Sequence, residues 1–304
     1  MASVTTRPKR LFKLVSALAT ALLLSVEMAC ADGLPSINEQ FQHSLAELEA
    51  THGGRLGVAV LDTETGRRFD YRADERFAMT STFKWVLVAA VLDRVDAGQE
   101  ALDRSVRYND SDILSYAPIA IQHLSDGSMT VAELSDASIR YSDNTTANLL
   151  LETLGGPAGL TAFMREQGDT VSRLDRNEPE LNTNLPDDPR DTTTPAAMVN
   201  LMESVLLGDT LSVESRVRLQ DWLILNTTGD SKLRAGLHPQ WTVGDKTGSG
   251  ARGASNDVAV VWRPGAKPLL IAVYYSGSDL SNDALSAVHA DVGRLVTDLF
   301  SNGD

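Results

Sequence analysis

Apolar residues recur at helical spacing near both ends of the chain. From Ile37 to Leu48 they stand at steps of four, four and three, which predicts a helix that begins after Ser36. Between Leu285 and Leu299, six apolar residues form a single stripe at helical spacing, which predicts a second, longer helix. We expect these two helices to cover one sheet with their apolar stripes.

Shorter segments rich in Val, Ile, Tyr and Trp predict strands rather than helices. These segments are 55–62, 67–71, 241–246, 257–263 and 269–276. The first two are separated by the turn residues 63–66 and therefore predict a β-hairpin. Such short connections favour an antiparallel sheet over parallel strands joined by crossover helices.

The middle of the chain, 79–225, has mostly helical periodicity. A capping box begins at Thr130, a Gly-Gly-Pro stop begins at Gly155, and Thr194 precedes a proline as an N-cap. We therefore predict an α+β fold, in which a three-layer α/β/α arrangement with an antiparallel sheet receives an inserted all-α domain. A ligand is expected in the crevice between the two parts.

The expected domains follow from this order of elements. A discontinuous α/β domain would comprise 32–76 and 226–304, and the all-α domain would comprise 77–225. No internal repeat or low-complexity linker interrupts this organisation.

Residues 1–31 have the features of a secretory signal peptide. A basic start is followed by the apolar run 14–26 and by small residues at 29–31, which form a cleavage site. A buried N-terminal helix and lipidation at Cys30 are the alternatives. Cleavage near Ala31 predicts an exported protein, periplasmic or secreted, whose mature form has no cysteine and no segment that spans a membrane.

Composition narrows the classes of function. Of 304 residues, 42% are apolar and 22% charged, a globular balance that excludes collagen-like, coiled-coil and fully disordered chains. The net charge of −14 argues against binding to nucleic acid. Five histidines without a metal-binding cluster and a single cysteine predict no zinc site. Nothing indicates an obligate partner, so we expect a monomer.

Ser81 and Lys84 form an S-x-x-K pair at the start of an apolar helix, where positions three apart share a face. A neighbouring base can make a serine hydroxyl nucleophilic, and a helix N-terminus supplies N–H groups for an oxyanion. A simpler interpretation makes Ser81 an N-cap and Lys84 a solvated side chain. The apolar neighbours at 83–87 argue against that, because burying an ammonium group is costly.

Two further short motifs carry polar groups suited to a binding cleft. Ser-Asp-Asn at 142–144 lies between two predicted helices and could present a hydroxyl and an amide, or simply cap the next helix. The run Lys246-Thr247-Gly248 ends the strand that begins at Trp241 and could bind a carboxylate. Taken alone, it could equally be a strand that ends in a glycine turn.

The segment 171–194 has weak periodicity, and a loop this long in a compact domain is usually functional or disordered. It contains the acidic, proline-bearing sequence of 176–182. Arg176 could pair with Asp191 and close the loop. A solvated surface loop is the alternative interpretation.

The four motifs follow one another as S-x-x-K, S-D-N, E-x-x-L-N and K-T-G, and this order is far more specific than any one motif. Three of them form the signature of class A β-lactamases and penicillin-binding proteins. From Ile37 to Leu299 the chain resembles a class A serine β-lactamase. The resemblance implies an exported enzyme without metal or cofactor that hydrolyses β-lactam antibiotics and confers resistance to them.

The resemblance assigns acylation to one group of residues. Ser81 would be the nucleophile, and Lys84 would help to remove its proton. Ser142 would pass a proton to the lactam nitrogen with assistance from Lys246. The backbone N–H groups of Ser81 and Ser249 would form the oxyanion hole.

A second group would bind the substrate and complete its hydrolysis. Glu178 and Asn182 would hold the water that attacks the acyl-enzyme. Asn144 would bind the side-chain amide of the substrate, and Thr247, with the lysine before it, would bind the carboxylate. Tyr116 would stand at the edge of the cleft, although an ordinary half-buried tyrosine explains this residue equally well.

The loop around Glu178 separates this family from its nearest rival, a penicillin-binding D-alanyl-D-alanine peptidase or transpeptidase. Glu178 and Asn182 argue against that rival, because rapid ester hydrolysis needs a positioned base. In the family, Arg176 and Asp191 close the loop and the peptide bond of 178–179 is often cis. We predict both features here.

The chain departs from many relatives at the carboxylate pocket. They place an arginine near it, whereas here the corresponding strand position is Ser255. We expect Lys232 to substitute for that arginine, with Arg252 as the second candidate and a merely solvated Lys232 as the alternative. The preference among penicillins, cephalosporins and carbapenems stays open.

Overall fold

The computed structural model describes residues 1–5 and 36–301. The chain divides into two units, Met1–Ser36 and Ile37–Asp304. The described residues of the first unit belong to no helix or strand. The predicted signal peptide falls almost wholly outside the described residues and stays a prediction. No described helix is long and apolar enough to cross a membrane.

A five-stranded antiparallel sheet organises the second unit, in the order β2-β1-β9-β8-β7. Its strands are β1 (Arg55–Asp62), β2 (Arg68–Tyr71), β7 (Thr242–Ser249), β8 (Ser255–Trp262) and β9 (Leu269–Ser276). The predicted hairpin is the β1–β2 pair, and the order confirms that the second half of the chain returns to complete the sheet of the first.

The edge strand β7 is longer than its sequence predicts. Hydrophobicity alone ends it at Lys246, whereas it pairs with β8 as far as Ser249, which lies opposite Ser255. The strand β8 begins with polar residues, so hydrophobicity does not predict that this part of the sheet is buried. These side chains are buried and form specific hydrogen bonds instead of apolar contacts. The K-T-G motif therefore lies within a strand instead of ending one.

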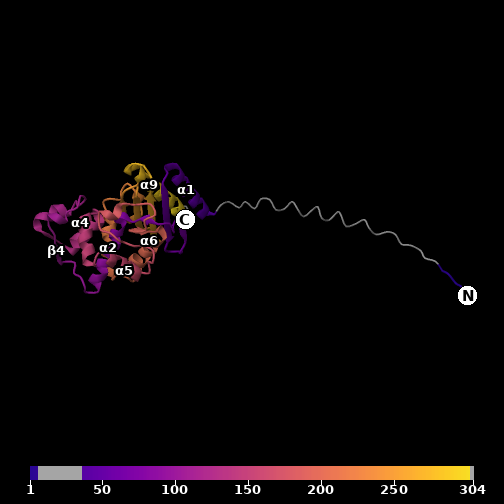
Figure 1. Cartoon of the computed structure of the whole chain (residues 1–304), viewed down its shortest axis with the longest axis horizontal. Helices are drawn as coiled ribbons and strands as arrows, with labels where there is room; N and C mark the ends of the chain where they lie inside the picture. The colour runs from indigo at the N-terminus through magenta and orange to yellow at the C-terminus, as the bar shows by residue number, and fades with distance from the viewer. Residues whose placement is uncertain (6–35, 302–304) are drawn as a thin grey trace. The chain divides into compact units, whose positions relative to one another are not determined.

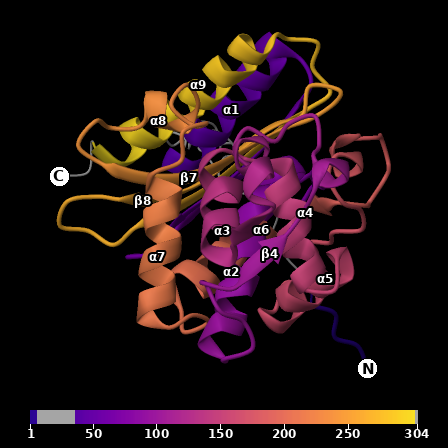
Figure 2. The same cartoon turned by 90° about the vertical axis from the view of Figure 1, so that its left-hand side faces the viewer.

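Helices cover both faces of the sheet (Figures 1 and 2). One face carries α1 (Ile37–His52), α8 (Leu233–Gly236) and α9 (Asn282–Ser301). The predicted helices at the two ends of the chain are thus confirmed, and α1 lies beside α9. Their apolar stripes pack on the sheet with side chains such as Leu45 and Val292.

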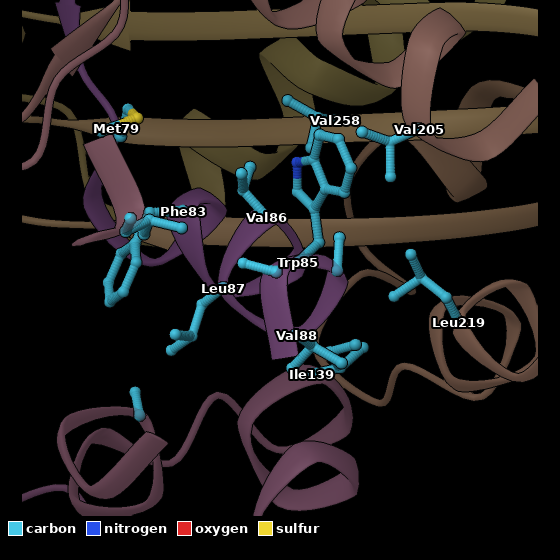
Figure 3. Packing of buried hydrophobic residues seen from close by; sticks show 14 of the residues in the cluster. Met79, Phe83, Trp85, Val86, Leu87, Val88, Ile139, Val205, Leu219 and Val258 are labelled. Carbon is cyan, nitrogen blue, oxygen red and sulfur yellow. The ribbon is translucent and has the colours of Figure 1, made fainter. Parts of the chain in front are cut away.

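The helical block covers the opposite face. Its α-helices are α2 (Phe83–Asp96), α3 (Val131–Arg140), α4 (Asn144–Thr153), α5 (Pro157–Glu166), α6 (Pro195–Met202) and α7 (Val213–Ile224). Residues 83–92 of α2 are all buried, because neighbouring elements surround this part of the helix (Figure 2). Trp85 points toward Val258 of the sheet, whereas Val88 points toward Ile139 of α3 (Figure 3).

Short elements connect these helices. They are the 3₁₀ turns at Thr80–Thr82, Asp110–Asp112, Ala120–Asp126 and Glu180–Asn182, the π-turn at Glu203–Leu207, and the short strands β3 (Phe77–Ala78), β4 (Ser105–Arg107), β5 (Ser128–Thr130) and β6 (Thr192–Thr193). The strand pairs β3–β6 and β4–β5 were not predicted, because two or three residues show no measurable alternation.

Local signals set the ends of several helices as predicted. Thr130 and Glu133 form the capping box of α3, and the side chain of Thr194 caps α6 ahead of its proline.

The helices and the antiparallel sheet together confirm the predicted α+β fold class. The division into two domains stays a prediction, since residues from Ile37 onward form one compact unit.

Candidate active site

The nucleophile candidate Ser81 lies in a 3₁₀ turn that runs directly into α2. Its side chain caps no helix, so the simpler N-cap interpretation is wrong. Lys84 follows one turn later on the same face, and its Nζ lies 3.0 Å from Ser81 Oγ. Thr80 has a φ of 45°, a left-handed conformation that is strained for a β-branched residue.

Asn256 of β8 stabilises this strained turn. Its Nδ2 donates to the backbone oxygens of Ala78 and Met79, at 2.9 and 3.0 Å, and to Thr80 Oγ1, at 2.8 Å. Three acceptors on consecutive residues fix the backbone just before the nucleophile. Sequence analysis missed Asn256, because a single amide in a strand carries no recognisable motif.

Lys84 is completely buried at the centre of the site. Besides Ser81, its Nζ donates to the backbone oxygen of Ser142 at 2.8 Å and to Asn144 Oδ1 at 2.6 Å. Glu178 Oε1 lies 3.0 Å away. Burial lowers the pKa of Lys84, while the Glu178 carboxylate opposes that shift. A neutral amine is therefore more accessible here than on an ordinary lysine.

The Ser142–Asn144 segment serves both roles considered for it. Asp143 is the N-cap of α4, and its other carboxylate oxygen accepts hydrogen bonds from the amides of Ile119 and Ala120, both at 2.9 Å. Ser142 has a φ of 57°. The cap thus holds the turn, while Ser142 and Asn144 contribute groups to the site.

Lys246 joins β7 to this turn. Its Nζ donates to Ser142 Oγ at 3.0 Å and to the backbone oxygen of Thr247 at 2.9 Å. Burial and the nearby charge of Lys84 lower the pKa of Lys246 to about 7. Ser142 is consequently in contact with both lysines, through its backbone oxygen and its hydroxyl.

The strand β7 approaches the nucleophile turn so closely that only glycine fits at position 248. A Cβ there would lie 2.1 Å from Thr80 Oγ1 and 3.1 Å from the amide nitrogen of Ser81. The backbone of the K-T-G strand and the Ser81 N–H group therefore line the same small space.

The loop that carries Glu178 is closed as predicted. Arg176 Nε and Asp191 Oδ2 lie 2.6 Å apart, and Asp191 Oδ1 also accepts the amides of Asp175 and Arg176. The Glu178–Pro179 bond is cis, which confirms the second prediction for this loop.

The side chain of Asn148, on α4, holds the backbone of Glu178 by two hydrogen bonds. It accepts a hydrogen bond from the Glu178 amide and donates one to the Glu178 carbonyl, each at 2.9 Å. The sequence does not predict this two-sided contact with the backbone, because an asparagine within a helix carries no motif for it.

The carboxylate of Glu178 meets the nucleophile directly. It is only 2% exposed, and its Oε1 lies 3.4 Å from Ser81 Oγ. Asn182 Nδ2 donates to Glu178 Oε2 at 2.5 Å. Asn182 Oδ1 is buried and accepts no hydrogen bond from the described part of the chain. Residues from α2, β7 and two loops thus converge on one centre.

The remaining predicted binding residues surround this centre. Thr247 Oγ1 lies 2.5 Å from Thr228 Oγ1, and Ser249 is exposed at the end of β7. Tyr116 is 50% exposed, and its backbone oxygen accepts the amide of Asn144. This exposure fits a tyrosine at the edge of the cleft and an ordinary half-buried tyrosine equally, so the role of Tyr116 stays a prediction.

Lys232 is buried beside the K-T-G strand and is not solvated. Its Nζ donates to Ser255 Oγ at 2.9 Å, to the Asn256 carbonyl at 3.0 Å and to the Gly248 carbonyl at 3.4 Å. His289 of α9 lies on the other side of Ser255, with Nε2 3.2 Å from its Oγ. Sequence analysis missed His289, because only lysine and arginine were considered on that helix.

Arg252 lies apart from the catalytic groups. It is exposed in the turn after β7, and it lines a cavity to which none of the proposed catalytic side chains contributes. As for metals, no group of three or more His, Cys, Asp or Glu side chains suited to a metal ion exists within the described residues.

Comparison with known proteins agrees with this geometry. The model of the β-lactamase enzyme family matches residues 40–300. The chain is 45% identical to the β-lactamase CTX-M-25 of Escherichia coli, covering 95% of this chain and 97% of the relative. It is 49% identical to the β-lactamase L2 of Stenotrophomonas maltophilia, covering 82% of each.

Solved structures give the same result. An ancestral class A β-lactamase is 59% identical, covering 86% of this chain and all of the other, with a TM-score of 0.85. A putative class A β-lactamase from Rhodopseudomonas palustris is 52% identical, covering 85% and 99%, with a TM-score of 0.84. The chain therefore belongs to the β-lactamase enzyme family, within which it is a class A serine β-lactamase.

Proposed function

We propose that this enzyme hydrolyses β-lactams in two steps at the centre formed by Ser81, Lys84 and Glu178. The observation that carries the proposal is the convergence of a buried amine and a buried carboxylate on one hydroxyl. Lys84 Nζ and Glu178 Oε1 lie 3.0 and 3.4 Å from Ser81 Oγ. Either group can take the serine proton, and the acylating base of this class is disputed.

Acylation opens the strained four-membered ring. Ser81 Oγ attacks the lactam carbonyl, and the C–N bond breaks as the ester forms. Ser142 gives its hydroxyl proton to the departing nitrogen, and Lys246, 3.0 Å from that hydroxyl, resupplies it. The proton taken from Ser81 then restores Lys246, so the step consumes no net proton. The N–H groups of Ser81 and Ser249 receive the developing oxyanion, which the close approach of β7 to the nucleophile turn favours.

Deacylation is assigned to the Glu178 loop. The Glu178 carboxylate and the unpaired Asn182 Oδ1 are two buried acceptors that can orient the two protons of one water molecule. Glu178 takes one proton as that water attacks the ester carbonyl of Ser81. The ester C–O bond then breaks, and the proton returns to Ser81.

Substrate binding is assigned to the rim of this centre. Asn144 and Tyr116 would contact the side chain of the substrate, and Lys246, Thr247 and Ser249 would bind its carboxylate. We further infer that the enzyme is exported and acts as a monomer, in keeping with its N-terminal pattern and its acidic surface.

A chromogenic cephalosporin tests the mechanism in a single assay. Glu178→Ala should release one equivalent of product per enzyme in a burst and then stall, because acylation proceeds without deacylation. Glu180→Ala, which removes an exposed carboxylate from the same loop, is the matched control and should turn over continuously. Continued fast turnover by Glu178→Ala would contradict the role of Glu178, and a burst without turnover in the wild type would indicate a penicillin-binding peptidase.

Lys232 is proposed as the second cation of the carboxylate pocket. It is buried within 3.4 Å of the Gly248 carbonyl, on the strand that carries Lys246 and Thr247. Lys232→Ala should raise KM for penicillins about tenfold, the loss expected for a charged hydrogen bond. An unchanged KM would refute this role, and a raised KM in Arg252→Ala instead would transfer it to Arg252.

A further inference from the structure

A large cavity lies beneath the loop that carries Glu178. Its volume is about 860 Å³, and its walls come from 54–55, 75–76, Ala78, 184–190, Thr192, Arg252 and 276–277. Arg176, which closes the loop, also lines it. Ser81, Lys84, Ser142 and Lys246 do not, so the cavity is distinct from the catalytic centre.

Positive charge is concentrated in this cavity. Its charged lining residues are Arg55, Arg76, Arg176, Arg190 and Arg252 against Glu75, Asp187 and Asp188. Cations therefore outnumber carboxylates here, whereas the whole chain carries a net charge of −14. A local reversal of this kind marks a place where an otherwise repelled anion is attracted.

Three of the arginines are paired with carboxylates, although Arg55 shares Glu75 with Arg72. Arg55 pairs with Glu75 at 2.8 Å, and Arg190 pairs with Asp188 at 2.7 Å. Arg176 pairs with Asp191 behind the cavity wall. These three guanidinium groups hold the wall in place and have little charge left for a ligand.

The other two arginines are not neutralised. Within the described part of the chain, Arg76 donates only to uncharged oxygens, the Val171 carbonyl at 3.0 Å and Thr192 Oγ1 at 2.9 Å. The side chain of Arg252 makes no hydrogen bond or ion pair with any described residue, and Asp187 is the one lining carboxylate in the same state. Two unpaired guanidinium groups thus face a single unpaired carboxylate.

We propose that this cavity is a binding site for a phosphate group, held by Arg76 and Arg252. The planar guanidinium forks match the oxygens of a phosphate. The cavity is also much larger than the ion, so it can take the organic part of a phosphate ester. A ligand held by both side chains would join the segment before β3, which carries Arg76, to the turn after β7, which carries Arg252.

Calorimetric titration of the purified enzyme tests this site, with inorganic phosphate and glycerol phosphate as probes at constant ionic strength. We expect one site per chain and tighter binding of the ester if the cavity also receives its organic part. Arg252→Ala should weaken binding about tenfold, and Arg76→Gln with Arg252→Ala should abolish it. Because Arg252 is exposed and its side chain is unpaired, its replacement should not disturb folding.

Two controls separate this site from the catalytic cleft, which could also attract an anion. Arg107→Ala removes an exposed arginine of β4 and should bind like the wild type. Lys246→Ala removes one cation of the cleft and should also retain binding. Binding that survives the double substitution, or that is lost in Lys246→Ala, would place the anion elsewhere and overturn the proposal. No binding by the wild type would overturn it as well.

Discussion

Two buried lysines in contact with one serine define the electrostatics of the site. Lys84 has a carboxylate partner in Glu178, whereas Lys246 donates only to neutral acceptors among the residues that the structure describes. Desolvation and repulsion by Lys84 therefore lower the pKa of Lys246 to about 7. An amine with this pKa can bind an anion and exchange a proton near neutrality.

The pH dependence of kcat/KM should reveal this titration. Lys246 is charged below about pH 7 and neutral above it, so the attraction for the substrate carboxylate fades as the pH rises. We expect kcat/KM for a penicillin to fall about tenfold between pH 6 and pH 8, following the protonated fraction of the free enzyme. Lys246→Arg stays cationic and should lose this dependence, while Lys267→Arg at an exposed position should keep it. A flat wild-type profile would contradict the lowered pKa.

The Glu178 loop has a fixed conformation because hydrogen bonds hold its two ends together. Asp191 is fully buried, and its carboxylate accepts three hydrogen bonds, two from backbone amides and one from Arg176. Asn148 holds the backbone of Glu178 in the middle. A catalytic carboxylate on an otherwise irregular segment is thereby positioned as firmly as one on a helix.

Removal of the arginine should loosen this loop and destabilise the protein. Arg176→Ala leaves the buried Asp191 carboxylate without its cation, which should lower the free energy of unfolding by about 3 kcal/mol. kcat should fall more than the acylation rate, because Glu178 acts in the second step. Urea denaturation and burst kinetics measure the two effects.

A matched ion pair in the same loop provides the control. Arg173→Ala breaks the more exposed contact with Asp175 and should cost at most about 1 kcal/mol. Equal losses in the two variants would show that the buried pair has no special role in closing the loop.

Chemistry could be predicted from the sequence more readily than backbone geometry. Ser81, Lys84 and Lys246 were identified because few residue types perform nucleophilic and proton-transfer chemistry, and their motifs occur in a fixed order. Asn256 and Asn148 were missed, because an amide that supports a backbone has no characteristic spacing. The extension of β7 was missed because buried hydrogen bonds, which hydrophobicity does not reveal, stabilise its last three residues.

At the scale of the molecule, one sheet supports two hydrophobic clusters. Alternate residues of β9 point to opposite faces: Ile271 and Val273 pack toward α1 and α9, whereas Leu270 and Ala272 pack toward the helical block. β1 and β8 divide their residues in the same way. The two hydrophobic clusters therefore share the same strands. Disruption of one cluster should destabilise these strands and, with them, the other cluster.

A substitution far from the active site tests this coupling and, with it, the expected division into two domains. Leu45→Ala removes a fully buried side chain of α1 and should lower the free energy of unfolding by about 2–5 kcal/mol. Because the sheet is common to both clusters, hydrogen exchange should accelerate in α2 as much as in β9. Val217→Ala, at a half-exposed position of α7, is the control and should change stability by less than about 0.5 kcal/mol. Unchanged protection of α2 in Leu45→Ala would mean that the helical block is stable by itself, as an independent domain requires.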